Sequence, residues 1–455
     1  MEHASPVYNV PPAWAPAQAF RSGGPGPVRR ALLAARERTL SLADAYQDAL
    51  SAAGMQVPYA QTVNPPLWEL AHLAWFQEYW CLRNRGDKAP VPSMVANADA
   101  LYNSALVPHD TRWDLPLLPI DQVRRYLKNV LDRVLERLDG APDDSALRYF
   151  AELTAAHEEM HCEAFTYTRQ TLAYRAPRSM VSALVSDEAP CRGDVAVPGG
   201  TYMLGARRSG DFVFDNEKWE HSVTLQPFSI SRSAVTNREF CEFVEDGGYQ
   251  RRELWTSEGW RWRESTTANA PVYWQKNGNG WLQRRYDTLG PLPMDKSIIH
   301  VNWYEADAWC TWAHRRLPSA AEWEQTAATT PAHPQGDAGK RLYPWGDTAP
   351  LPDRTNLYGA CNEVAAACAF ATGDSAWGCR QMMGNVWEWT ADWFSPYPAF
   401  TRDPYKEYSE PWFGDHKELR GGCFATSPAL MRNTWRNFYT PDRRDVFAGF
   451  RTCAT

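Results

Sequence analysis

The chain has 455 residues, which is too long for one ordinary hydrophobic core and predicts two domains. Apolar residues make up 44% and charged residues 22% of the sequence, as in a folded protein, and the net charge of −7 argues against a basic surface for nucleic acid. No apolar run approaches the roughly 18 residues of a membrane-spanning helix, and no signal peptide is recognisable. Ten scattered cysteines without a C-x-x-C pair indicate reduced thiols and a cytoplasmic location.

The first part of the chain has the periodicity of long helices. Residues 1–26 are rich in Pro, Ala and Gly, and we expect them to form a flexible leader. Good helix formers at a helical period then predict four helices, at 27–50, 67–83, 120–140 and about 143–174. Because a long crossover joins the second helix to the third, residues 27–184 are predicted to form an antiparallel four-helix bundle.

The periodicity and composition of the sequence change after about residue 185. Long periodic runs disappear, and short segments rich in Gly, Pro and Trp take their place, among them VPGGTYMLGA, LYPWGD and GNVWEWTADW. Isolated helical stretches are predicted at 236–246 and 304–314. Residues 185–455 are therefore expected to form an irregular α+β domain held by aromatic side chains.

Three histidines of the predicted bundle form a candidate metal site. His157 and His161, in HEEMH, share one face of a helix and can hold one metal ion. The same spacing occurs in zinc proteases, where Glu158 would be the general base, but no third ligand follows it in the expected pattern. His72, in LWELAHLAWF, is a better third ligand, because bundles build metal sites from inward-facing histidines. From spacing alone, it is equally possible that His72 is a hydrogen-bonded core histidine and that HEEMH is an exposed polar turn. Imidazole binds Zn, Cu, Fe and Ni, so the type of ligand does not identify the metal.

The order of motifs adds a resemblance to known families. The segments VPGGTYMLGA, AVTNREFCEFV, HVNWYEADAWC, MMGNVWEWTADWF, LRGGCFATSP and AGFRT resemble the formylglycine-generating-enzyme fold, which is related to C-type lectins. The first domain resembles a DinB-like four-helix bundle. A fusion of the two resembles the ergothioneine-type sulfoxide synthases, which are non-heme iron enzymes. They use O2 to join a sulfur donor to the imidazole of hercynine, the trimethylated betaine of histidine.

The resemblance implies which residues bind the cofactor and hercynine. His72, His157 and His161 match the ligands of Fe(2+), and a structural Ca(2+) in the second domain is left open. Asn437 and Phe438 match positions that line the hercynine pocket, where an aromatic wall attracts the quaternary ammonium group.

The resemblance also implies a change of chalcogen donor. Of four positions that bind the donor in the family, Arg112 and Arg443 are retained, whereas His109 and Tyr439 stand in place of an arginine and an aspartate. Paired guanidinium groups suit a dicarboxylate such as γ-glutamylcysteine. Since half of that set has changed, we expect a different donor, a selenosugar, and selenoneine as the product.

The family has a tyrosine near the iron that donates a proton or an electron. Downstream of GNVWEW, Tyr397 is the candidate, and Phe394 is the alternative occupant of that position. Met160 stands where relatives carry a glutamine that hydrogen-bonds hercynine, which puts one substrate contact in doubt.

Other functions stay open. The protein could use a thiol donor such as cysteine or γ-glutamylcysteine in ergothioneine synthesis, or be a metal-binding adaptor without activity. A copper-dependent formylglycine-generating oxidase shares only the second domain and needs a second cysteine soon after Cys423, whereas the next one is Cys453. The expected partners are small molecules (hercynine, a chalcogen donor and O2), with neither nucleic acid nor membrane.

Overall fold

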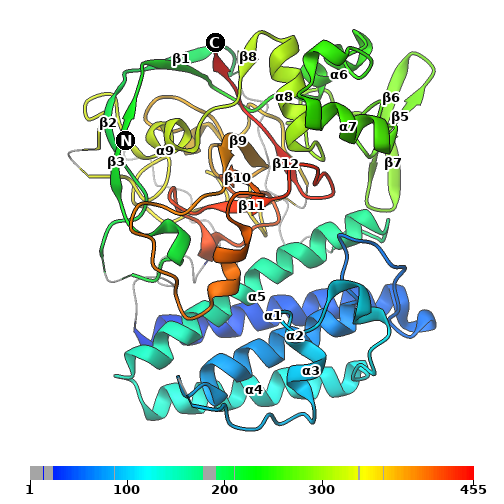
Figure 1. The fold of residues 1–455 in the computed structure, drawn as a ribbon, viewed down its shortest axis with the longest axis vertical. Helices are drawn as coiled ribbons and strands as arrows, with labels where there is room; N and C mark the ends of the chain where they lie inside the picture. Colours follow the sequence, from blue (N-terminus) through cyan, green and yellow to red (C-terminus); the bar gives the residue numbers. More distant parts are fainter. Residues whose placement is uncertain are drawn as a thin grey trace, which may run out of the picture.

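The computed structural model describes Trp14 and residues 24–86, 88–177, 191–209, 211–336, 339–361 and 363–455. Over these residues a helical bundle lies against an irregular α+β domain (Figure 1). Most of the predicted leader and the predicted boundary at residue 184 lie outside the described residues. Trp14 is described, and its side chain is buried in the hydrophobic core.

Four long helices form the bundle, as their periodicity predicted. They are α1 (Pro25–Leu50), α2 (Pro66–Glu78), α4 (Ile120–Gly140) and α5 (Ser145–Thr171). A π-helical segment, η3 (Tyr79–Arg83), extends α2, and the crossover to α4 carries the short α3 (Ala98–Tyr102) and the 3-10 helix η4 (His109–Trp113). In the bundle α1 packs along α5 and α2 packs along α4 (Figure 1).

Helix α2 runs through the interior of the bundle. Every residue of this helix except Leu67 is buried. Because α2 is buried on all sides, it forms part of the core. Helix α4, by contrast, is amphipathic and buries one stripe that includes Val123, Leu127 and Val134. The sequence therefore carries His72 into the centre of the domain.

Arg36 of α1 joins all four long helices. Its Nε and Nη2 atoms donate to the two carboxylate oxygens of Glu158 on α5 at 2.7 and 3.1 Å. Nη2 also donates to Gln77 Oε1 on α2 at 3.0 Å, and Nη1 donates to the carbonyl oxygen of Leu127 on α4. The two charged side chains are only 4% and 2% exposed. Because a buried charge is costly without a partner, this network fixes how α5 sits in the bundle.

The C-terminal domain is built from short strands in four small sheets. One sheet has the order β1 (Asp194–Val197), β4 (Phe228–Ser231), β13 (Cys453–Ala454), β8 (Arg315–Arg316). The central sheet has the order β11 (Asn437–Tyr439), β10 (Lys417–Arg420), β9 (Trp387–Trp393), β12 (Ala448–Gly449). The others are β2 (Gly200–Leu204) with β3 (His221–Leu225), and β5 (Trp274–Asn277), β6 (Gly280–Arg285), β7 (Thr288–Pro291). Only β12 and β9 pair in parallel among the described strands.

Four helices flank these sheets. Two of them, α6 (Asn237–Glu245) and α8 (Trp303–Trp312), were predicted, whereas α7 (Ser257–Thr266) and α9 (Ala320–Ala328) were not. Helix α9 begins with a capping box in which Ser319 and Glu322 satisfy each other's backbone N–H groups. That motif is readable in the sequence and could have revealed this helix.

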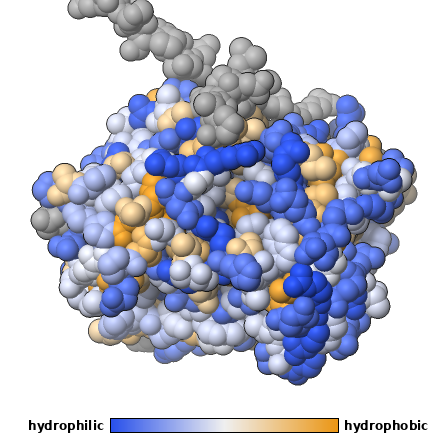
Figure 2. All heavy atoms as spheres, turned by 90° about the horizontal axis from the view of Figure 1, so that it is seen from above, coloured by the Kyte–Doolittle hydropathy of each residue, from blue (hydrophilic) through white to orange (hydrophobic). Residues whose placement is uncertain are grey.

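The two domains meet along α1 and α5. Glu163 of α5 accepts hydrogen bonds from Trp387 Nε1 at 2.7 Å and from Thr426 Oγ1 at 2.5 Å, and burial raises the pKa of its carboxyl group. Arg38 of α1 donates to the carbonyl oxygen of Ala425 at 2.6 Å. Hydrophilic residues cover most of the face that the C-terminal domain turns away from the bundle, with separate apolar patches among them (Figure 2).

Two expectations from composition can be compared with the fold. All ten cysteines are free thiols, as predicted. Within the described part of the chain, the helices lack the combination of length and apolar character that crossing a membrane would require.

Replacing Arg36 by Met should destabilise the bundle strongly, because it leaves Glu158 buried without its counter-charge. We expect the free energy of unfolding to fall by about 3–5 kcal/mol in chemical denaturation. Arg29→Met is the matched control, because Arg29 pairs with Asp139 at the surface and that pair contributes roughly 0–1 kcal/mol. Equal effects of the two substitutions would contradict the importance given to Arg36.

Candidate metal centre and its surroundings

The three histidines singled out in the sequence lie together in the structure. Each of His72, His157 and His161 offers one ring nitrogen, and these atoms all lie within 4.8 Å of one another. Their ring centroids are 4.5–5.2 Å apart. His72 and His157 are buried, whereas the His161 side chain is 20% exposed, so the cluster is most accessible at His161.

Hydrogen bonds orient two of the three rings. His72 Nδ1 lies 2.7 Å from the carbonyl oxygen of Tyr102, and His161 Nδ1 lies 2.6 Å from a carboxylate oxygen of Glu69. Both partners are acceptors, so Nδ1 donates in each case and Nε2 keeps the lone pair. An imidazole held by a carbonyl or carboxylate through one nitrogen is the usual arrangement of a metal-binding histidine.

Burial keeps His72 and His157 uncharged. It lowers the pKa of His72 to about 3, with a smaller contribution from the neighbouring His161, and it lowers the pKa of His157 well below its ordinary value. Neutral imidazole is the form that binds a metal. Three imidazole ligands fit Fe(2+), and they equally fit other first-row divalent ions.

The acidic residues between the histidines have structural partners. Both carboxylate oxygens of Glu158 bind Arg36, and Glu159 pairs with Arg38 at 2.7 Å. Glu158 is therefore engaged as an ion-pair partner, which disfavours the role of general base that a zinc protease would require.

Aromatic rings surround the histidines. Trp68 stacks on His72 at 4.9 Å between ring centroids, and Phe76 stacks on His157 at 3.7 Å. The Tyr405 ring, from the segment between β9 and β10, lies 6.1 Å from His157 and 4.7 Å from Phe76. Burial raises the pKa of Tyr405, so its hydroxyl group stays protonated at neutral pH.

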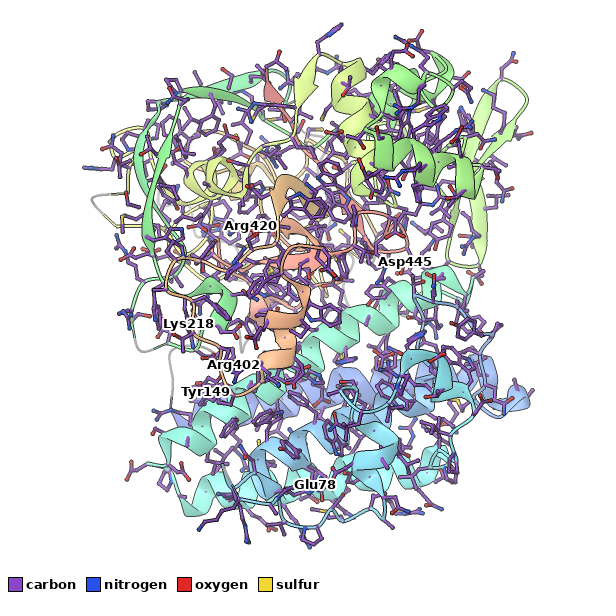
Figure 3. All side chains as sticks on the ribbon, viewed as in Figure 1. Glu78, Tyr149, Lys218, Arg402, Arg420 and Asp445 are labelled. Atoms are coloured by element: carbon purple, nitrogen blue, oxygen red, sulfur yellow. The ribbon has the colours of Figure 1, made fainter. Side chains whose placement is uncertain are left out.

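Asp403, two residues before Tyr405, anchors the segment that carries this tyrosine. Asp403 accepts a hydrogen bond from Tyr149 of α5 at 2.9 Å and pairs with Lys218 at 2.7 Å. Figure 3 shows Tyr149 and Lys218 close together where the C-terminal domain meets the bundle, near Arg402, the residue before Asp403. These bonds fix the segment against the helix that carries two of the three histidines.

Tyr397, the tyrosine predicted from the motif, lies elsewhere. Its hydroxyl accepts a hydrogen bond from Arg420 at 3.1 Å, the Arg436 guanidinium lies 4.1 Å from its ring centroid, and its ring packs with Tyr202 and Leu204 of β2. The structure thus places Tyr405, and not Tyr397, next to the histidines. The alternative, Phe394, stacks on Phe438. The segment that follows GNVWEW has no helical or strand period, so the number of residues after the motif did not predict which tyrosine lies near the histidines.

The predicted hercynine residues lie on β11. Phe438 lies between Phe394, at 4.1 Å between centroids, and Tyr408, at 5.6 Å. Tyr408 in turn lies 6.5 Å from Tyr405, so an aromatic series leads from His157 to Phe438. Asn437 precedes Phe438, and its side-chain oxygen accepts the backbone N–H of Phe438 at 2.9 Å.

The predicted donor residues of the crossover take different positions. The Arg112 guanidinium lies 3.7 Å from the Trp68 ring centroid and donates to Asn64 Oδ1 at 2.7 Å, so Arg112, Trp68 and His72 form one stack. Burial lowers the pKa of Arg112 to about 10. His109 does not join the cluster, because its Nε2 atom is bonded to the carbonyl oxygen of Val63 at 2.7 Å.

The two C-terminal donor residues face α5. Arg443 pairs with Asp445 at 2.7 Å, and its guanidinium lies 5.1 Å from the Tyr439 ring centroid and 5.9 Å from that of Tyr167 on α5. Figure 3 places Asp445 at the edge of the C-terminal domain above α5. Burial raises the pKa of Tyr439 well above its ordinary value, so its hydroxyl is neutral.

Two further positions noted in the sequence lie in the core. Met160 is partly buried against the main hydrophobic cluster. Cys423 is buried, with a pKa well above its ordinary value because of burial, and Cys453 lies on the separate strand β13. A packed thiol is the role expected for Cys423.

Comparison with known proteins agrees with this architecture. Residues 31–165 match the DinB superfamily, and residues 181–455 match the sulfatase-modifying factor enzyme 1-like domain. A hercynine oxygenase of Mycolicibacterium thermoresistibile is 36% identical over 434 residues, 93% of this chain and 94% of the relative. A hercynine oxygenase of Mycobacterium tuberculosis is 34% identical over 426 residues, 92% of this chain and 96% of the relative. A formylglycine-generating enzyme of Thermomonospora curvata is 30% identical but covers only 58% of this chain. The chain therefore belongs to the family of the hercynine oxygenases, the ergothioneine-type sulfoxide synthases.

Proposed function

We propose that the protein is an iron-dependent oxygenase that forms a carbon–chalcogen bond on the imidazole of hercynine, with Fe(2+) on His72, His157 and His161. The convergence of three imidazoles, two of them oriented through Nδ1, carries this proposal. The relatives that match almost the whole chain bear the name hercynine oxygenase, which favours iron over the other ions that imidazole suits. When bound, iron would supply the activation of O2 and hold the reactants together.

The aromatic series beside the histidines suits hercynine. A quaternary ammonium group is attracted to the faces of aromatic rings, and Phe438 and Tyr408 supply such faces. Tyr405, which follows in the series, lies between them and His157. Hercynine bound in this orientation would direct its imidazole toward the histidines.

Tyr405 is the proposed proton donor of the reaction. Its ring lies near His157, its hydroxyl is protonated at neutral pH, and Asp403 anchors its segment to α5. A positioned hydroxyl can deliver a proton to the reacting atoms without moving the backbone.

The arrangement around the donor positions supports a donor other than γ-glutamylcysteine. Arg443 is already paired with Asp445, His109 is bonded to a backbone carbonyl, and Tyr439 is neutral. That leaves Arg112, which forms no ion pair with any carboxylate that the structure describes. One available guanidinium is too few for two carboxylates. We therefore favour a selenosugar as donor and selenoneine as product, because hydroxyl groups can bond to neutral side chains and stack on aromatic rings.

Cysteine is the second candidate donor. It has a single carboxylate, and Arg112 could bind it with a pair of hydrogen bonds. In that case the protein would be an ergothioneine-pathway sulfoxide synthase. The structural Ca(2+) left open by the family resemblance stays a prediction.

Removing a histidine should abolish stable iron binding. We expect His72→Ala and His161→Ala to retain far less than one iron per chain after anaerobic loading and desalting, measured by metal analysis. Glu69→Gln, which weakens the hydrogen bond to His161, should lower iron affinity by about 10- to 100-fold. His314→Asn, a change at an exposed histidine outside the cluster, is the control and should keep full iron content. Full occupancy in His72→Ala would refute the assigned ligands.

Tyr405→Phe should slow hercynine-dependent O2 consumption by about 10²- to 10⁴-fold, since it removes the proton donor while keeping the ring. Tyr397→Phe is the matched comparison. We expect it to lower stability slightly, because Arg420 loses a hydrogen bond, and to leave kcat nearly unchanged. The reverse pattern of rates, measured with an oxygen electrode, would restore Tyr397 as the functional tyrosine.

The donor can be identified by competition. Iron-loaded protein should convert hercynine fastest with a selenosugar, more slowly with a thiosugar or cysteine, and slowest with γ-glutamylcysteine, as followed by mass spectrometry of the products. A preference for γ-glutamylcysteine would contradict the interpretation of His109 and Tyr439. Absence of hercynine-dependent O2 uptake with every donor would favour a metal-binding adaptor.

A further inference from the structure

A cavity lies in the C-terminal domain beyond the end of α5. Its volume is about 280 Å³, and it is lined by the β6–β7 hairpin, residues 293–300 and the rings of Phe424 and Phe447. Gln170 of α5 also lines it, nine residues after His161 and therefore about 13 Å further along the helix. Figure 1 shows the β5–β7 sheet reaching toward that end of α5, away from the middle of the helix where the histidines lie.

Three buried polar atoms of the lining lack a hydrogen-bond partner among the residues that the structure describes. They are Asn237 Oδ1, Tyr286 Oη and His300 Nδ1, on side chains that are 1%, 2% and 2% exposed. Buried polar groups in folded proteins almost always have partners, because an unpaired one destabilises the folded state. Three such groups around one cavity indicate that the missing partner is a ligand.

The unpaired atoms can all accept hydrogen bonds. The Asn237 amide nitrogen donates to the carbonyl oxygen of Pro293 at 2.8 Å, which leaves its oxygen to accept. Burial lowers the pKa of His300 to about 3, so its ring is uncharged at neutral pH. Nδ1 of an uncharged imidazole accepts in one tautomer and donates in the other. The Tyr286 hydroxyl can donate or accept. A matching ligand presents several hydroxyl or N–H groups.

The cavity also has an excess of positive charge. Arg284, Arg285 and Lys296 line it together with one carboxylate, Glu363, and the neutral His300 adds no charge. Lys296 and Arg285 both pair with Glu363, whereas Arg284 donates to the carbonyl oxygens of Gln170 and Tyr286. Three cations and one carboxylate leave two positive charges in excess. The Arg285 side chain is 53% exposed, so this charged side opens to solvent.

We propose that this cavity binds a small polyhydroxylated anion, of the class of sugar phosphates and sugar acids. The hydroxyl groups would donate to Asn237 and bond to His300 and Tyr286, while the anionic group would face Arg284, Arg285 and Lys296. Phe424 and Phe447 offer apolar surface to the carbon skeleton. The cavity volume is close to the lower end of small-molecule sites, about 300 Å³. This proposal does not depend on the reaction at the histidines.

Calorimetric titration of the full-length protein tests the proposed ligand class. The probes are glucose 6-phosphate, gluconate, glucose and inorganic phosphate, each at low and at physiological salt. We expect glucose 6-phosphate or gluconate to bind more tightly than glucose and phosphate, with an affinity that falls as salt rises. Binding of neither hydroxylated anion, or equal binding of glucose, would overturn the proposal.

Substitutions locate the binding. Tyr286→Phe should weaken binding of the anion about three- to tenfold and leave Tm unchanged or higher, because the hydroxyl has no partner among the residues that the structure describes. Tyr249→Phe is the matched control, since its buried hydroxyl donates to Glu305 at 2.6 Å, and it should lower Tm without changing Kd.

Arg285→Gln should weaken the same anion about tenfold or more, because it removes a charge at the cavity mouth. Arg261→Gln, in which a surface arginine paired with Glu258 on α7 is changed, should leave Kd unaltered. An unchanged Kd in both Tyr286→Phe and Arg285→Gln would show that the anion binds elsewhere and would refute the assigned cavity.

Discussion

The guanidinium group of Arg36 is buried where α1, α2, α4 and α5 come together, and each of its three nitrogen atoms donates to at least one of the other three helices. Leaving such a charge unpaired would cost several kcal/mol, so the helices have little freedom to slide or rotate. Glu158, its partner on α5, directly follows His157, and Gln77, its partner on α2, directly follows Phe76, whose ring stacks on His157. The interaction that holds the bundle together therefore also fixes where the histidines lie along the helix axes and which way they face.

Helix α5 serves both domains because its faces differ. His157 and His161, four residues apart, point toward α2, whereas Glu163 and Gln170 contact the C-terminal domain. Residues three and four apart share a helix face, so one rigid element can fix a cluster inside the bundle and a docking surface outside it. The hydrogen bonds of Glu163 with Trp387 and Thr426 then hold the C-terminal domain against α5, and Asp403 adds a contact with Tyr149 of the same helix.

The C-terminal domain has little regular structure, and charge pairs hold its loops in place. Glu418 of β10 accepts from both Arg420 and Arg436, and Arg420 also reaches Glu324. Glu418 lies opposite Phe438 in the β10–β11 register, so this fully buried network supports the strand that carries the proposed hercynine residues. Tyr397 belongs to the same network through Arg420, which accounts for the burial of its hydroxyl group.

The amino-acid sequence by itself determined the features that depend on neighbours a few residues away. The helical period located α1, α2, α4 and α5, the four-residue spacing put His157 and His161 on one face, and the order of motifs identified the family. The family resemblance also named His72 as the third ligand, and the tertiary structure places it beside that pair. Only the tertiary structure decided that Tyr405 rather than Tyr397 lies beside the histidines, and that the crossover histidine, His109, is held by a backbone carbonyl. The reason is physical: periodicity and capping act within one or two turns of chain, whereas the position of an irregular segment is set by buried contacts between residues that are far apart in the sequence.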